Sequence, residues 1–193
     1  MTADLRRIYL NDVIARYRGL KSLADGAIVQ LEGNELFQLF SEGGNSVAHL
    51  MKHLAGNMIS RWSDFLTSDG ESATRNRDAE FEIGEADDAD ALNAAWDQGW
   101  QTLLTTLESL TPDDLDKEVL IRGESHSVIE ASNRQIAHYG MHVGQIVLLA
   151  KQSRSAAWKT LSIPKGRSQE FNAKMSDRTE SLYRKGMLTG PSS

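Results

Sequence analysis

The chain has 193 residues, a formal net charge of -6 and a pI near 5.4. This length fits one domain, or one domain with an added tail, and it is enough to bury a substantial core. The acidic balance argues against nucleic acid as a main partner, because phosphate binding needs clustered Lys and Arg. The sequence has no Cys. Disulfides and thiolate metal sites are therefore excluded, and a transition-metal site would have to use His, Asp, Glu or backbone oxygen.

The first residues, MTADLRRIYLND, mix charged and apolar side chains and lack the apolar core of a secretory signal. No apolar run approaches the ~20 residues that a membrane-spanning helix needs. From these two observations we expect a cytoplasmic protein with no membrane partner.

The first half of the chain predicts two helices and a long loop. Apolar residues at intervals of three and four predict a helix over 4–31 and a core-facing helix over 46–66 that includes Trp62. An irregular stretch with Gly43 and Gly44 separates them. Residues 67–90 are rich in Gly, Ser, Asp, Glu and Arg, and predict a long polar loop. Loops of this length are often binding or lid elements, or else disordered.

The second half predicts two more long helices. Residues 91–110, with Trp96 and Trp100 expected in the core, form the third. A Thr-Pro-Asp sequence at 111–113 then predicts a single short helical turn, and residues 119–122 are extended in character. The fourth long helix should start near the capping-box pair Ser127 and Glu130 and run to about residue 151.

Four long helices with apolar stripes and almost no alternating strand pattern predict an all-α four-helix bundle over residues 1–155. Residues 158–164 are expected to form a loop, and 168–184 a weaker, more polar fifth helix. We therefore expect 156–193 to be a C-terminal extension that packs on the bundle or on a dimer partner, with a frayed end.

The most informative motif is HYGMHVGQ, which places His138 and His142 one turn apart on the predicted fourth helix. Side chains four apart on a helix are neighbours, so both rings can bind one metal ion if a third ligand comes from another helix. His53 is the candidate for that ligand. The same spacing also arises by chance, as a surface or helix-stabilising pair. Tyr139 follows His138, so the zincin HExxH motif is absent, and no Glu-x-x-His pairs supply a di-iron site.

These residues resemble a known family. A helix bearing VAHLMKHLAGNMISRW, a long polar loop, a helix, and a helix bearing HxxxHxGQI resemble, over about residues 9–151, the DinB/YfiT-like superfamily of bacterial metal-binding four-helix bundles. The segments NSVAHLMKHLAGNMISRWSDFLTSDGE, RNRDAEF and LSIPKGRSQEFN are similar to one uncharacterised subfamily of it, over nearly the whole chain.

The resemblance implies that His53, His138 and His142 bind a divalent metal ion, which could be Zn, Ni, Fe or Mn. His49 does not match the ligand position, so we expect a solvated neighbour, and we expect His126 to be a loop residue. The resemblance also implies a homodimer.

Three imidazoles leave one to three coordination positions open, as in catalytic sites. The metal could acidify a water toward pKa ~7, polarise a substrate oxygen or bind a thiolate. A thiol would have to be an external low-molecular-weight one, as in superfamily members that transfer groups to such thiols.

Several neighbouring residues could complete a pocket. Asn57 and Gln145 either orient a ligand or are helix-flank hydrogen bonders. In the polar loop, Asp78 and Glu80 are candidates for a carboxylate base. Arg75 and Arg77 in the same loop could serve an anionic substrate, or the whole loop is simply a charged surface.

These observations favour a metal-dependent enzyme of hydrolase or thiol-dependent transferase type, acting on a small molecule. The alternative is a non-catalytic metal-binding or stress-associated bundle. A third hypothesis, a helical interaction module, uses no metal.

Overall fold

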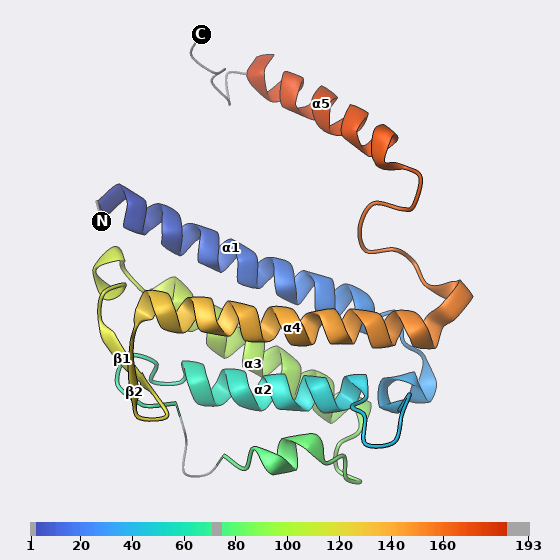
Figure 1. The fold of residues 1–193 in the computed structure, drawn as a ribbon, viewed down its shortest axis with the longest axis horizontal. Helices are drawn as coiled ribbons and strands as arrows, with labels where there is room; N and C mark the ends of the chain where they lie inside the picture. Colours follow the sequence, from blue (N-terminus) through green and yellow to red (C-terminus); the bar gives the residue numbers. More distant parts are fainter. Residues whose placement is uncertain (1–2, 71–74, 185–193) are drawn as a thin grey trace. The chain divides into compact units, whose positions relative to one another are not determined.

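The computed structural model describes residues 3–70 and 75–184, and of residues 3 and 178–184 the backbone alone. Four long helices form the bundle, as predicted: α1 (Ala3–Ile28), α2 (Val47–Trp62), α3 (Ala89–Ser109) and α4 (Val128–Arg154) (Figure 1). Helix α2 ends earlier than expected, because Asp64 adopts a left-handed conformation with φ of 49°. The fold class is all-α, confirming the sequence prediction.

The four helices contact one another in a ring, in which α1 packs on α4, α4 on α2, α2 on α3, and α3 on α1. Helices α1 and α4 run in one direction, and α2 and α3 run in the other (Figure 1). Because α2 and α3 are parallel, the connection 63–88 has to return along the bundle. On it lies the short 3-10 helix η2 (Asp78–Phe81), which contacts α2. The predicted polar loop is thus brought against the second helix.

Hydrogen bonds at the start of α4 fix where its histidines fall. Ser127 Oγ accepts the Glu130 backbone N–H at 3.2 Å, and the Glu130 carboxylate accepts the Ser127 backbone N–H at 2.7 Å. This is the capping box that the sequence predicts, and it starts the helix at Val128.

A small hairpin lies between η3 (Pro112–Asp114) and α4. Strands β1 (Glu118–Ile121) and β2 (Glu124–Ser127) pair antiparallel, with Glu118 opposite Ser127 and Ile121 opposite Glu124. The extended character of 119–122 is confirmed, but its partner strand was not predicted. The assignment of His126 to a loop is wrong: it lies in β2, because the two-residue turn at 122–123 folds the next four residues back onto β1.

Aromatic side chains fill the centre of the bundle. The predicted core residues Trp62, Trp96 and Trp100 are buried, together with Tyr17 and Tyr139. Trp62 Nε1 donates a hydrogen bond to Tyr139 Oη at 3.0 Å, so the buried indole N–H is satisfied. These contacts tie α2 to α4 near the site described below.

The chain divides into two units, residues 1–158 and 159–193. The first contains the bundle, the hairpin and the 3-10 helices η1 (Gly33–Phe37) and η4 (Ser155–Ala157). The second contains α5 (Ser168–Arg184), at the position predicted for a polar fifth helix. The predicted packing of this extension on the bundle or a partner stays a prediction, and its expected frayed end lies outside the described residues. Within the described residues, no helix is both long and apolar enough to cross a membrane.

Candidate metal centre

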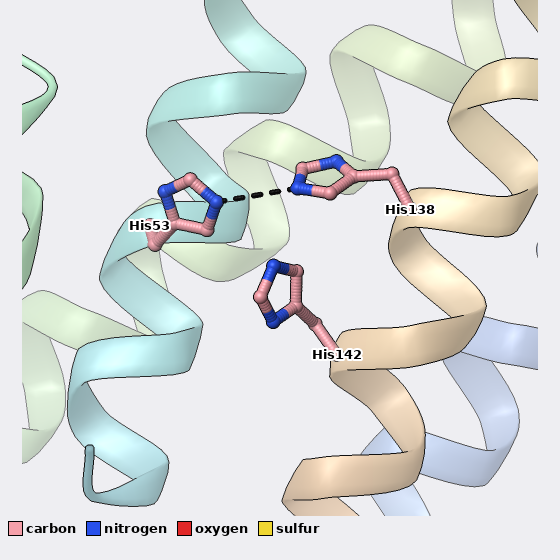
Figure 2. Close-up of side chains that lie close together, drawn as sticks. All are labelled: His53, His138 and His142. Atoms are coloured by element: carbon pink, nitrogen blue, oxygen red, sulfur yellow. Dashed lines mark hydrogen bonds between the residues drawn. The ribbon is translucent and has the colours of Figure 1, made fainter. Parts of the chain in front are cut away.

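Three histidine rings from two helices meet in the bundle. His53 comes from α2, and His138 and His142 come from successive turns of α4; all three rings turn toward a shared space (Figure 2). One ring nitrogen from each residue lies within 4.8 Å of the other two. The Nε2 atoms of His53 and His138 are 3.3 Å apart. The structure therefore brings together the three residues that the sequence singled out, in an arrangement that can bind a metal ion.

The donor set fits a first-row divalent ion. Imidazole nitrogen suits Zn, Cu, Fe and Ni. Two nitrogens bound to zinc at about 2.05 Å and at a tetrahedral angle would lie about 3.3 Å apart. The Nε2 atoms of His53 and His138 have this separation. His53 and His142 are also buried, with 2% and 9% of their surface exposed, so bulk water competes little for their nitrogens.

The nitrogens on the far side of two of the rings are held by hydrogen bonds. His53 Nδ1 lies 2.9 Å from Glu80 Oε2, and His142 Nδ1 lies 2.7 Å from Gln145 Oε1. Both partners are acceptors, so each ring carries its proton on Nδ1 and keeps the Nε2 lone pair for the shared space. Metal-binding histidines are typically oriented in this way. Phe81 stacks on the His53 ring, with 4.5 Å between ring centroids.

Glu80 is itself fixed from two sides. Arg75 donates from Nε to Glu80 Oε1 at 2.7 Å and from Nη2 to Oε2 at 2.9 Å. Gly56 on α2 provides the space, since a Cβ atom there would lie 2.5 Å from Glu80 Oε1. The carboxylate therefore sits against the helix that carries His53, at a place where a larger residue would displace it.

Burial and neighbouring charges set the protonation of these groups. Burial, followed by the nearby His142, His53, Arg75 and Arg77, lowers the pKa of His138 from 6.5 to about 4. Burial also lowers the pKa of His142. Burial alone would raise the pKa of Glu80, but the hydrogen bonds from His53 and Arg75 outweigh it and lower that pKa. At neutral pH the two α4 histidines are thus neutral, as metal ligands must be, and Glu80 is charged.

A cavity of about 220 Å³ opens beside the cluster. His53 and His138 form part of its wall. The other lining residues are polar or cationic with one exception: Asn57, Arg61, Arg75, Arg77, Ile121, Arg122, Arg134 and Gln135. The cluster therefore borders a space that a small molecule can enter.

A family model described as "Protein of unknown function (DUF1572)" matches residues 4–181. The chain belongs to this family. The match contains the bundle, the three histidines and nearly all of α5. Comparisons with curated proteins and with solved structures found no match.

The other predicted site residues take different positions. Asn57 is buried and lines the cavity, while Gln145 contacts His142. Asp78 is exposed, and neither Asp78 nor Glu80 is among the described residues that line the cavity. Their assignment as a carboxylate base stays a prediction. His49 is half-buried, and its Nδ1 accepts the Ser46 backbone N–H at the start of α2.

Several residues at the site carried no usable sequence signal. Phe81, Arg122 and Arg134 reach it from a 3-10 helix, a hairpin turn and a helix that are far apart in the chain. Gln135 could have been found, since it lies three residues before His138 on the same flank of α4.

Proposed function

We propose that this protein is a metal-dependent enzyme of hydrolase or transferase type that acts on a small molecule, with a divalent ion held by His53, His138 and His142. The observation that carries the proposal is the convergence of three ring nitrogens beside an open cavity whose wall includes His53 and His138. The DinB-like resemblance of the sequence supports the same assignment and makes Zn, Ni, Fe and Mn the ions to test first.

The ligand set favours catalysis over a purely structural ion. Structural zinc sites are usually closed by four protein ligands, whereas catalytic sites keep a position open. Within the described residues, the group contains three side chains and no fourth His, Asp or Glu. A bound ion would supply Lewis-acid chemistry to a water or substrate in the adjoining cavity.

The surrounding residues have distinct roles in this proposal. Glu80 orients His53 through Nδ1, and Gln145 does the same for His142. Both oxygens of Glu80 are engaged by Arg75 and His53, which favours a positioning role over that of a general base. Asn57 faces the cavity, where it can contact a substrate.

The test is a reaction screen on metal-loaded protein. Purified protein is loaded separately with Zn, Ni, Fe or Mn and assayed for ester and amide hydrolysis and for group transfer to low-molecular-weight thiols. We expect one activity that is lost with chelator, regained with metal, and absent from His142→Ala. Activity that persists in His142→Ala would contradict the proposal.

A thermal measurement on the same samples separates the non-catalytic alternative. An ion that is only structural should change Tm greatly and support no reaction. A catalytic ion on a preformed bundle should change Tm less.

A further inference from the structure

Arginine side chains gather around the cavity beside the three histidines. They come from four separate parts of the bundle unit: α2, the connection 63–88, the turn of the hairpin, and α4. The five are Arg61, Arg75, Arg77, Arg122 and Arg134. Among the described residues that line this cavity there is no Asp or Glu. In a chain with a net charge of -6, this is a local concentration of positive charge.

Two of these arginines are positioned by hydrogen bonds to Asp69. The Arg61 side chain is buried, and its Nη1 donates to the backbone oxygens of Asp69 and Leu120. The backbone N–H groups of Arg122 and Gly123 donate to the Asp69 carboxylate at 3.3 and 2.9 Å. Asp69 therefore fixes the turn that carries Arg122, because its carboxylate accepts hydrogen bonds from the backbone of that turn.

The turn places an arginine where the backbone does not favour one. Arg122 has φ of 55° and Gly123 has φ of 78°. Two positive φ values in a two-residue hairpin loop are typical of a type I′ turn, for which Asn-Gly is the preferred pair. A long side chain such as that of arginine is strained in this left-handed region, and such strain tends to occur at functional sites.

Two carboxylates outside the cavity lining pair with these arginines. Glu80 pairs with Arg75, while Glu124 is 3.9 Å from Arg134. The Glu80 carboxylate is also hydrogen-bonded to His53 Nδ1, so it is shared between Arg75 and His53. Among the described lining residues, the cavity wall thus carries five guanidinium groups and no carboxylate.

Asn57 adds a neutral donor to the same wall. The Trp62 indole can only donate, so Tyr139 Oη accepts from it and donates its own proton to Asn57 Oδ1 at 2.9 Å. Gln135 Nε2 also donates to Asn57 Oδ1, at 3.4 Å. With Oδ1 engaged in this way, the amide NH2 group of Asn57 is the part left for the cavity that this residue lines.

We propose that this cavity binds a doubly charged tetrahedral oxyanion, the phosphate group of a small substrate or free phosphate, next to the three-histidine cluster. Guanidinium groups match oxyanions with paired N–H donors, and several together favour two negative charges over one. A volume of about 220 Å³ suits a small ligand. The proposal rests on the proposed function for the use of this anion as a substrate handle, but anion binding itself requires no metal.

The test is calorimetric titration of inorganic phosphate into full-length, chelator-treated protein at constant ionic strength. Sulfate, acetate and methyl phosphate are titrated in parallel. We expect phosphate and sulfate to bind, with acetate weaker by about tenfold or more. If methyl phosphate binds as well as inorganic phosphate, the ligand is the phosphate group of an ester. If inorganic phosphate binds and methyl phosphate does not, the ligand is free phosphate. Equal affinity for acetate and phosphate would overturn the proposal of a doubly charged ligand.

The decisive variant is Arg122→Asn, since it removes the guanidinium and gives the turn its preferred Asn-Gly pair. We expect an unchanged or higher Tm and phosphate affinity reduced about tenfold or more, with a similar loss in Arg134→Gln. Arg16→Gln is the matched control, because Arg16 is exposed on α1 and pairs with Asp12. Its phosphate affinity should match the wild type within about twofold. Equal phosphate affinity in all four proteins would overturn the proposal.

Metal content is measured on the same preparations before chelation. Wild-type protein that takes up metal but binds no phosphate would overturn the anion site and leave the metal centre standing. Arginine-dependent phosphate binding in protein that takes up no metal would support the anion site and contradict the proposed function.

Discussion

The Nε2 atoms of His53 and His138 lie 3.3 Å apart, although 85 positions separate the two residues in the chain. They are carried by α2 and α4, two helices tied together by the buried hydrogen bond between Trp62 and Tyr139. Ligands on packed helices lose little conformational freedom when they bind an ion. The cluster is thus preorganised, and residues that orient its rings should control metal affinity.

Glu80→Gln tests the group that orients His53. Glutamine keeps the shape of the side chain but turns one acceptor into a donor facing Arg75, so the double hydrogen bond is lost. Loss of such an outer hydrogen bond typically lowers metal affinity by about 10- to 100-fold. We expect this loss in a competition titration with a metal-binding dye. Glu85→Gln, on the exposed part of the same connection, should leave the affinity unchanged. Equal affinities in both variants would rule out the orienting role.

Gly56→Ala tests the same relationship from the helix side. A Cβ atom at Gly56 would lie 2.5 Å from Glu80 Oε1 and push the carboxylate away from His53. We expect weaker metal binding, although alanine favours a helix. Gly19→Ala is the matched control, since nothing lies within 4 Å of its added Cβ on α1. It should raise the free energy of unfolding by about 0.5–1 kcal/mol and leave metal affinity as it is. A Gly56→Ala protein with wild-type metal affinity would show that the site tolerates a displaced Glu80.

Tyr139→Phe tests the buried hydrogen-bond chain behind the site. It leaves Trp62 Nε1 without its acceptor and removes a donor to Asn57 Oδ1. Buried polar groups left unsatisfied cost about 1–3 kcal/mol, so the free energy of unfolding in urea should fall by that amount. Tyr9→Phe is the control, because the half-buried Tyr9 hydroxyl contacts Ile129 O and Asn133, where water can replace it. If Tyr139→Phe lowers the free energy of unfolding no more than Tyr9→Phe does, the result would contradict a buried chain of hydrogen bonds through Tyr139.

The pKa of His138 predicts how the stability of metal-free protein depends on pH. Burial, His142, His53 and the arginines lower this pKa to about 4 in the folded state, against 6.5 when unfolded. The unfolded chain therefore takes up a proton first as the pH falls. The free energy of unfolding should be highest above pH 6.5 and should decrease toward pH 4. His142, whose pKa is also lowered, adds to the same trend.

His138→Asn provides the comparison for that pH dependence. We expect a shallower decrease in stability between pH 6.5 and 4 in this variant, measured by urea unfolding at each pH. A profile as steep as that of the wild type would show that His138 is not the group responsible.

The helices and the metal ligands were predictable because they depend on local patterns. Apolar spacing located all four bundle helices, and the capping box of Ser127 and Glu130 located the start of α4. The i, i+4 spacing of His138 and His142 then placed both rings on one flank. His53 was the candidate from the second helix, and the family resemblance implied the same residue, since spacing within one helix cannot by itself identify a ligand on another.

The surroundings of the cluster depend on tertiary contacts that no local pattern encodes. Glu80 was noted in the sequence as a base, but its pairing with His53 and Arg75 follows from the return of the connection 63–88 along α2. Arg122 and Arg134 reach the cavity from β-turn and helix positions that carry no motif. The net charge is a sum over the whole chain and therefore conceals a local group of five arginines. His126 was misplaced because a four-residue strand is too short to show alternation.

The central claim is that His53, His138 and His142 together bind a metal ion. Metal content per chain, measured by elemental analysis on protein purified without a histidine tag, tests it most directly. We expect about one divalent ion per wild-type chain and a strong loss in His53→Ala, His138→Ala and His142→Ala, while His126→Ala, in strand β2, retains the wild-type content. Equal metal content in all five proteins would contradict the claim.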